Sequence, residues 1–397
     1  MKTPKSKTNP IAKAVRYAII PLGALALAGF SGPAVCGVTL RSGNSYVTLD
    51  YDVQAWYQSR GYTSSTDSAG LNNFYLRRNR IVLSGQFNDY VGFFIDTDAP
   101  VDGQQGFNDR SVFYPDAYIT LDASQAVRFI VGKFKEPFAR ENLEDCFGAL
   151  TLDRSLTLAY NPFVHSRDTG VAMWGNLHNA MFQYRVMVSN GRQGTSNPKS
   201  DPMVTARVTA SLLDPEYGYG YESTYLGTMK VLTIGAAYQY QPNVVWDNFT
   251  AQTGAKNYEA WTTDIFYEYP FRSGTYTASA AYMHYNTGNA INSPNPDPNL
   301  PITSQLQGYY VKAGYMLPRK VSIGRLQFFL RYENSKYNLA TGYGDQHWQG
   351  AGFNYYISGE QLKVTAEFDR IVFNKQDPLD ASMQNYNMGT VGLQMLF

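Results

Sequence analysis

Residues 45–58 read SYVTLDYDVQAWYQ, and their side chains alternate between apolar and polar. Val47, Leu49 and Tyr51 fall on one face of an extended chain, whereas Thr48 and Asp50 fall on the other. This period of two predicts a β-strand with one apolar face and one polar face. Residues 385–397, NYNMGTVGLQMLF, repeat the pattern. Both ends of the patterned region are therefore predicted to be two-faced strands.

The alternating pattern occurs sixteen times, with turn-forming residues between the copies. The predicted strands are centred near Tyr51, Val82, Phe94, Tyr118, Phe129, Ala172, Tyr184, Val208, Ile234, Ile265, Ala280, Val311, Leu330, Phe353, Ala366 and Val391. An even number of two-faced strands is typical of an up-and-down barrel. The sequence therefore predicts an all-β fold, a 16-stranded antiparallel β-barrel that occupies residues 45–397.

The connections between predicted strands alternate between short and long. Residues 87–90 and 178–179 are short connections, whereas 135–167 and 286–305 are long ones. Such alternation is typical of barrels whose two rims face different compartments. The stretch 213–229 is long where the alternation requires a short turn. We interpret it only as an elaborated turn.

The composition indicates a membrane environment. The chain has 32 Tyr, 22 Phe and 34 Gly, while only 16% of its residues are charged. Aromatic girdles at two membrane interfaces and glycine in tight barrel turns would use residues in this way. An alternating strand that ends on an aromatic residue, here Phe397, resembles the assembly signal of outer-membrane barrels. Soluble sandwiches and propellers also alternate, but they leave the terminal strand, the loop asymmetry and the aromatic excess unexplained.

The N-terminal residues have the pattern of a secretory signal peptide. Five positive side chains precede residue 17, and the apolar stretch AIIPLGALALAGF follows them. We expect residues 1–34 to be removed, with cleavage near Ala34 to Cys36. A lipidated Cys36 is the rival interpretation, but Pro33 and Val35 are poor neighbours for it. With Cys146 as the second cysteine of two, no disulfide framework is expected.

A closed barrel in a membrane implies a pore. Sixteen strands enclose more space than side chains can fill, so a water-filled lumen is expected unless a loop narrows it. The longest connection, 135–167, is the candidate for an inward-folded constriction loop. The alternative is a solvated cap on the outside. The positive side chains of this loop are Lys135, Arg140, Arg154 and Arg167, and its negative ones are Glu136, Glu141, Glu144, Asp145 and Asp153.

Four segments resemble the phosphate-selective porin O and P family. They are YLRRNRIVLSGQF (75–87), DAYITLDASQAVRFIVGKFKEPF (116–138), Asp153-Arg154-Ser155 and SRDTGVAMWG (166–175). The resemblance implies a homotrimer of 16-stranded barrels in the bacterial outer membrane, with lumenal arginines and constriction lysines that attract anions. It places Lys133 and Lys135 near the constriction, whereas strict alternation places both on the outward face or at the outer rim. Both placements stay open at this stage.

Alternation also predicts which charged side chains face the lumen. The predicted pore-lining arginines are Arg78, Arg80, Arg128, Arg185, Arg207 and Arg331. Acidic residues such as Asp96, Asp264 and Glu367 fall on the same face. The arginines therefore form either an anion path or pairs that satisfy each other. We predict a channel for passive diffusion of small hydrophilic solutes and ions, with an anion or phosphate preference left open. The alternative is a general or weakly cation-selective pore.

Other functions lack the residues that they need. A barrel lipid hydrolase requires a serine activated by a histidine, and the four histidines are His165, His178, His284 and His347. His165 has Ser166 beside it, but adjacent residues of an extended chain point apart. No two histidines or cysteines have metal-ligand spacing, so neither a metal nor another cofactor is expected. The five positive side chains before residue 17 leave 28 of the 33 in the rest of the chain, against 32 acidic ones. The chain without residues 1–34 therefore has no excess of positive charge that would attract nucleic acid.

Overall fold

The structure is a computed structural model that describes residues 37–61, 70–100, 112–155, 163, 166–336, 344–375 and 384–397. The described residues all belong to the second of the two units into which the chain divides, Gly32–Phe397. The predicted signal peptide and Cys36 lie outside the described residues. Everything below therefore concerns the second unit.

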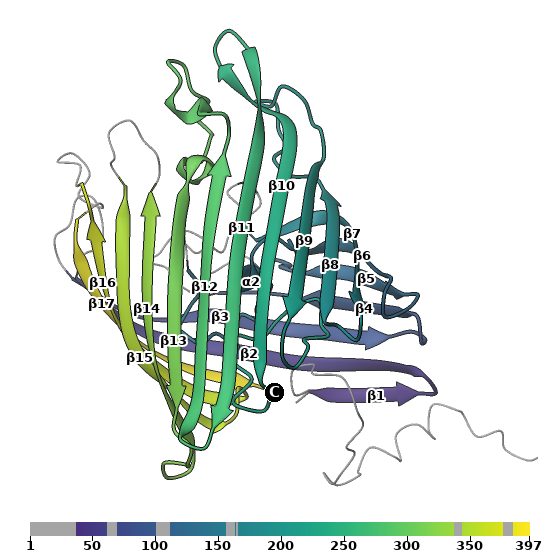
Figure 1. The fold of residues 1–397 in the computed structure, drawn as a ribbon, viewed down its shortest axis with the longest axis vertical. Coiled ribbons are helices and arrows are strands. Elements are labelled where there is room, and N and C mark those ends of the chain that lie inside the picture. Colours follow the sequence, from purple (N-terminus) through teal and green to yellow (C-terminus); the bar gives the residue numbers. More distant parts are fainter. Residues whose placement is uncertain are drawn as a thin grey trace, which may run out of the picture. The chain divides into compact units, whose positions relative to one another are not determined.

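The second unit is built almost entirely from antiparallel strands (Figure 1). The strands are β1 (Val38–Ser42), β2 (Ser45–Arg60), β3 (Leu71–Gln86), β4 (Val91–Asp96), β5 (Ala117–Asp122), β6 (Arg128–Lys135), β7 (Arg167–Leu177), β8 (Phe182–Ser189), β9 (Met203–Ser211), β10 (Val231–Asn248), β11 (Thr253–Phe271), β12 (Gly274–Asn286), β13 (Gln307–Met316), β14 (Arg325–Lys336), β15 (Gln346–Ser358), β16 (Leu362–Phe373) and β17 (Tyr386–Leu396). The short helices are α2 (Arg140–Leu143), η2 (Ala290–Asn292) and η3 (Ile302–Gln305).

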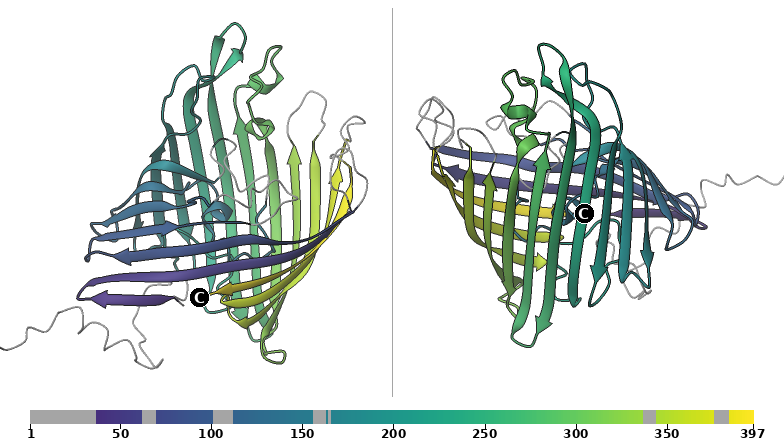
Figure 2. Two further views of the ribbon diagram at one scale, coloured as in Figure 1. Left: turned by 180° about the vertical axis from the view of Figure 1, so that it is seen from behind. Right: turned by 45° about the horizontal axis from the view of Figure 1, so that its top comes forward.

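Sixteen of the described strands, β2 to β17, close into a barrel. Each pairs with the next along the chain, and β17 returns to β2 with Leu393 opposite Ala55. Figure 2 shows from behind how β2 and β3 pass in front of the teal and green strands, so that the sheet encloses an interior. All sixteen predicted strand centres lie inside β2 to β17, so the predicted fold class is confirmed.

The first strand, β1, was not predicted. It pairs with the same edge of β2 that β17 uses, because Val38 lies opposite Leu49 and Leu396 lies opposite Asp52. The N–H of Phe397 donates to the carbonyl of Tyr51 at 3.0 Å, and Phe397 accepts from the N–H of Tyr51 at 2.8 Å. β1 and β17 thus share one edge of β2, and backbone pairing holds the C-terminal residue.

Alternation along the strands separates an inner face from an outer one. On β9, Val204 and Val208 are exposed, whereas Thr205 and Arg207 are buried. Apolar side chains on the outer face suit lipid, and polar side chains on the inner face suit a water-filled or hydrogen-bonded interior. No helix in the described part of the chain is long and apolar enough to cross a membrane.

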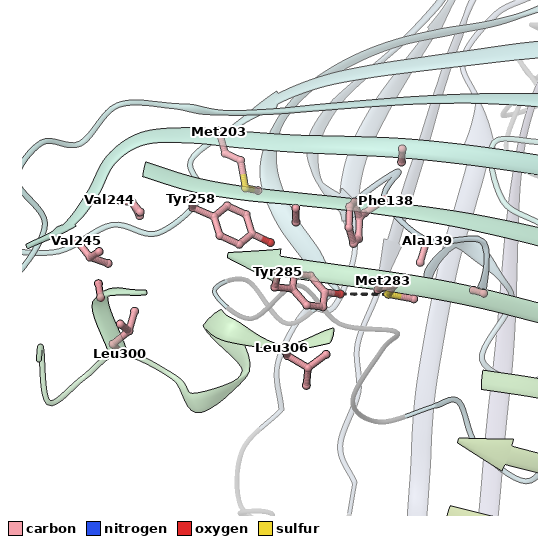
Figure 3. Close-up of a cluster of buried hydrophobic side chains, with 14 of the residues drawn as sticks. Phe138, Ala139, Met203, Val244, Val245, Tyr258, Met283, Tyr285, Leu300 and Leu306 are labelled. Atoms are coloured by element: carbon pink, nitrogen blue, oxygen red, sulfur yellow. Dashed lines mark hydrogen bonds between the residues drawn. The ribbon is translucent and has the colours of Figure 1, made fainter. Parts of the chain in front are cut away.

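One side of the interior holds an apolar cluster (Figure 3). Tyr258, Met283 and Tyr285 come from β11 and β12, and Leu306 comes from the connection before β13. Phe138, which follows β6, packs on Tyr285 with their ring centroids 5.5 Å apart. Removing a fully buried leucine side chain such as that of Leu306 costs about 2–5 kcal/mol. The cluster therefore fixes the chain after β6 against the β10–β13 side.

Candidate functional site

The connection after β6 lies inside the barrel. We call residues 136–155 the lumenal loop; residues 156–162, 164 and 165 of the predicted loop lie outside the described residues. Asn354 on β15 donates to the carbonyl of Leu150 at 2.7 Å, and Lys363 on β16 donates to that of Phe147 at 2.7 Å. The N–H of Leu152 donates to Glu367 at 2.7 Å. These partners lie on the buried face of strands far around the barrel, so the loop crosses the interior.

The connection between β9 and β10 also enters the barrel. We call residues 213–229 the inner segment. Tyr221 forms a parallel bridge with Glu144, its N–H donates to Leu143 at 3.2 Å, and its carbonyl accepts from Asp145 at 3.0 Å. Glu216 binds the Arg140 guanidinium at 2.7 Å. The interpretation of this stretch as only an elaborated turn was wrong, because it folds back to support the lumenal loop.

Three of the six predicted pore-lining arginines are tightly paired with acidic residues of the wall. Arg80 lies 2.8 Å from Asp98, and Arg207 lies 2.6 Å from Asp264. Arg331 pairs with Glu333, and its other terminal nitrogen lies 3.4 Å from Glu367. All three arginines are buried on the inner face. The inner face therefore carries salt bridges at these positions, and none of the three arginines lacks a carboxylate partner.

The other three arginines have different partners. Arg78 lies 2.9 Å from Asp153 of the lumenal loop and donates to Gln54 at 2.5 Å. Arg128 lies 3.8 Å from Asp122. Arg185 donates to the carbonyl of Tyr219 in the inner segment at 2.8 Å. These arginines thus connect the wall to the inserted segments or to a neighbouring turn.

A β-bulge brings a further arginine inside. β2 and β3 pair Gln54 with Arg78 and then Ala55 with Leu76, so Arg77 is an extra residue of β3. A bulge redirects side chains, and Arg77 joins Arg78 on Asp153, at 2.6 Å. Burial alone would raise the pKa of the Asp153 carboxyl, but the charges of Arg77 and Arg78 hold it well below its ordinary range. Strict alternation could not have found Arg77.

The two lysines at the end of β6 have separate positions. Lys133 donates to the carbonyl of Tyr114 at 3.1 Å in an exposed contact, on the side that alternation assigned to it. Lys135, the last residue of β6, donates to the carbonyl of Glu144 at 2.7 Å. Among the described contacts, only the Lys135 side chain of this pair reaches the lumenal loop.

A family model matches residues 47–397, which cover the barrel from β2 onward. The chain belongs to the phosphate-selective porin O and P family. It is a bacterial outer-membrane β-barrel that forms a channel for small solutes.

Solved structures share the barrel fold of this porin. OmpF of Salmonella typhi in complex with daunomycin is 15% identical, with 91% of this chain and 100% of that chain covered and a TM-score of 0.59. The outer-membrane channel DcaP of Acinetobacter baumannii is 15% identical, with coverage of 94% and 100% and a TM-score of 0.56. OprB of Pseudomonas putida is 10% identical, with coverage of 89% and 94% and a TM-score of 0.57. The search of curated proteins found no match.

The remaining predicted constriction residues of the porin mostly act as cross-links. Arg140 is fully buried between Glu216 and Glu144, the latter at 3.2 Å. Glu141 pairs with Lys312 on β13 and accepts from the N–H of Ser155 at 2.8 Å. Arg167 lies 2.9 Å from Asp116. The pairs of Arg140 and Glu141 hold the loop in place, whereas the pair of Arg167 and Asp116 joins the start of β7 to the start of β5.

Cations without a carboxylate partner meet at the tip of the lumenal loop. Arg154 and Lys135 both donate to the carbonyl of Glu144, and neither forms an ion pair among the described residues. Burial alone would raise the pKa of the Cys146 thiol, but the charges of Arg154, Lys135, Arg80 and Arg78 hold it well below its ordinary value. These cations therefore act together on the Cys146 thiol.

No metal centre is evident among the described residues, where no three His, Cys, Asp or Glu side chains gather as ligands. His347 lies 3.2 Å from Asn374, and His178 occupies the turn between β7 and β8. His165 of the predicted loop lies outside the described residues.

Proposed function

We propose that this porin passes small hydrophilic solutes and ions beside the lumenal loop and prefers anions. The observation that carries the proposal is the pair Lys135 and Arg154, which meet at the carbonyl of Glu144 without a carboxylate partner among the described residues. Lys135 lines a cavity, whereas Arg154 is buried behind it and acts only through its charge. Positive charge along the path of an entering anion lowers the barrier for it. The wall arginines contribute less, because most of them form ion pairs.

The inserted segments set where solutes pass. The apolar cluster occupies the β10–β13 side, whereas two cavities of about 190 Å³ each lie toward other strands. The charged residues that line the first cavity are Arg80, Lys135, Arg167, Asp96, Asp116 and Asp145. The second cavity is lined by residues of β2, β3 and β14 to β17 and by Leu152 and Asp153 of the lumenal loop. Cavities of this size suit solutes of a few non-hydrogen atoms up to single rings. We therefore expect a low size limit.

The proposed anion preference is tested by neutralising both cations. In planar bilayers with a salt gradient, Lys135→Gln with Arg154→Gln should lower the ratio of anion to cation permeability. A matched control is Arg319→Gln with Lys320→Gln, which removes the same charge from the exposed turn between β13 and β14. If both double variants keep the wild-type ratio, the two loop cations do not set the selectivity.

We propose that phosphate is one of the anions that pass through the channel, because the family is described as phosphate-selective. The ammonium group of Lys135 lines the first cavity and can donate to a phosphate oxygen, and the charge of the buried Arg154 supports it. Added phosphate should then reduce the chloride current of the wild-type channel more than it reduces that of the Lys135 and Arg154 double variant. Equal reduction in both would place any phosphate binding elsewhere.

We also propose that the assembled porin is a homotrimer. Strands β4, β5 and β6 contain only 6, 6 and 8 residues, whereas a membrane-spanning strand needs about 9–11. The outer face of this short wall is apolar, with Ile119 and Val131 exposed. A neighbouring copy would cover the face that lipid cannot cover fully. OmpT of Vibrio cholerae, 13% identical with a TM-score of 0.51, is described in a trimer form.

We finally propose that the porin is not an enzyme. Among the described histidines, His347 contacts Asn374 and His284 contacts Gln307, so neither has the serine partner of a hydrolase. Purified porin should release no fatty acid from labelled phospholipid vesicles. If the wild-type porin releases fatty acid and the Ser166→Ala variant does not, this proposal is contradicted.

A further inference from the structure

A cavity of about 190 Å³ opens in the half of the barrel that carries the long connections. Four aromatic side chains line it: Trp56 and Tyr75 from β2 and β3, Trp348 from β15 and Tyr386 from β17. Leu152 of the lumenal loop packs with Trp56 and Tyr75. An aqueous pore has no need of so many rings at one place, because each ring exposes apolar surface to water. We call this space the outer aromatic pocket.

Glycines on the inner face make room for the pocket. A Cβ added to Gly392 would lie 2.9 Å from the indole of Trp56, and one added to Gly350 would lie 2.7 Å from Arg331. Both contacts are too close for a real side chain. The missing side chains therefore let Trp56 and Arg331 lie across the neighbouring strands and face the pocket.

Most charges that line the pocket are already paired. Arg77 lies 2.6 Å from Asp153, and Arg331 lies 3.4 Å from Glu367. Such pairs leave little net field, because each cation has its own carboxylate. Their guanidinium groups also stack on the aromatic walls, with Arg331 4.4 Å from the centre of the Trp348 ring.

Arg60 differs from these cations. It forms no ion pair among the described residues, and its guanidinium lies 4.4 Å from the centre of the Tyr386 ring. One of its nitrogens, Nε, has no hydrogen-bond partner. Asp369 also lines the pocket without an ion pair, but it is only 1% exposed, whereas Arg60 is half-buried. The accessible unpaired charge of the pocket is therefore positive.

We infer that the outer aromatic pocket binds small aromatic carboxylates on their way through the channel. The ring of the solute would lie against Trp56, Tyr75 and Leu152, and its carboxylate would meet the guanidinium of Arg60. Aromatic pairs attract beyond the burial of their area, and a guanidinium can bind a carboxylate through two parallel N–H donors. Inorganic phosphate could use Arg60 but would leave the rings facing water. The inference rests on the proposed channel and names one class of solute for it.

The experiment measures how added solute blocks the ion current of the whole purified porin in planar bilayers. The probes at neutral pH are benzoate, acetate, benzylamine and phosphate. Benzoate should block at the lowest concentration, because it alone has both a ring and a negative charge of the right shape. If acetate blocks the current at the same concentration as benzoate, the aromatic rings play no role in binding. If benzylamine blocks at that concentration, the charge of Arg60 plays no role.

Two variants assign the block to the pocket. Arg60→Gln and Trp56→Ala should each raise the half-blocking concentration of benzoate about tenfold, the usual effect of losing one contact with a charged or aromatic partner. Matched controls are Arg319→Gln in the exposed turn and Trp261→Ala on the outer face of β11, where Trp261 is 42% exposed. Benzoate should block both control variants at the same half-blocking concentration as the wild type.

The outcomes separate this inference from the proposed function. If the wild type conducts ions, but benzoate blocks the Arg60→Gln and the folded Trp56→Ala variants at the same concentration as the wild type, the pocket inference is contradicted. The proposed channel function is then unaffected. Trp56→Phe serves if Trp56→Ala does not fold, and it should lose less affinity than Arg60→Gln. A wild-type porin that folds in the bilayer but conducts no ions contradicts the proposed function itself.

Discussion

Arg77 and Arg78 are neighbours in sequence, yet both hold Asp153 inside the barrel. Alternation could predict that Arg78 faces inward, because the period of two applies along a regular strand. It could not predict Arg77, because the bulge in β3 depends on how β2 pairs with it. It could not predict partners either, since Arg78 and Asp153 are 75 residues apart.

The two arginines should contribute unequally to stability. Arg78 is 4% exposed and Arg77 is 18% exposed, and Arg78 also donates to the buried Gln54, so the loss of Arg78 removes a donor from two buried acceptors. We expect Arg78→Gln to lower the free energy of unfolding by about 2–3 kcal/mol and Arg77→Gln by about 1 kcal/mol. Denaturant titrations in lipid vesicles measure both values, with Arg319→Gln as the control. A larger loss for Arg77→Gln would contradict the geometry.

The inserted segments are the elements that the sequence predicted least well. The length and charges of the 135–167 connection indicated a functional loop, and the structure places its described part in the interior. The inner segment showed only an unexplained length, because its contacts are made with distant residues. Its Tyr221 pairs with Leu143 and Glu144, which the sequence pattern could not reveal.

Shortening the inner segment should loosen the lumenal loop. Replacing residues 214–228 by a two-residue Asn-Gly turn removes Glu216, and the fully buried Arg140 then loses its closest carboxylate. We expect larger single-channel conductance and more current fluctuation. Shortening the exposed turn 318–323 on the same rim is the control and should change neither. Unchanged conductance in the first variant would show that the loop holds its position alone.

The lumenal loop should also make the selectivity depend on pH. Burial raises the pKa of Glu144 to about 7, although Arg140 opposes the shift, and burial raises that of Glu222 to about 8. Both carboxyls therefore lose negative charge as the pH falls from about 8 to about 6, so the anion preference should increase over this range. Reversal potentials measured at both ends of the range check this, and Glu144→Gln with Glu222→Gln should reduce the change in preference between the two ends. A preference that falls with decreasing pH would contradict it.

At the scale of the whole molecule, the number of strands and their order followed from the sequence because lipid and the interior impose a strict period of two. The uneven height of the wall did not follow, since the bounds of β4 to β6 depend on the loops that they join. Figure 1 shows these short strands separated from the longer β10 and β11 by β7, β8 and β9. The apolar cluster on the β10–β13 side could not be predicted either, because it joins side chains of strands and connections that are distant in the sequence.

The short wall predicts where subunits meet. Ile119→Asn on β5 should reduce the trimer fraction in native mass measurements, because it places a polar group in an apolar interface. Ile234→Asn on β10 makes the same change at a similarly exposed position, 47% against 51%, and should leave the trimer intact. Equal loss in both variants would indicate a general folding defect, and wild-type monomers alone would remove the trimer proposal.

The proposed anion preference depends on an open lumen in which Lys135 and Arg154 attract anions. The reversal potential of the wild-type porin under a potassium chloride gradient tests it most directly. We predict the sign of anion preference at about 0.1 M salt, and a smaller preference near 1 M, where the Debye length falls from about 10 Å to about 3 Å. A cation-preferring reversal potential at low salt would contradict the account and assign the leading role to the acidic residues of the loop.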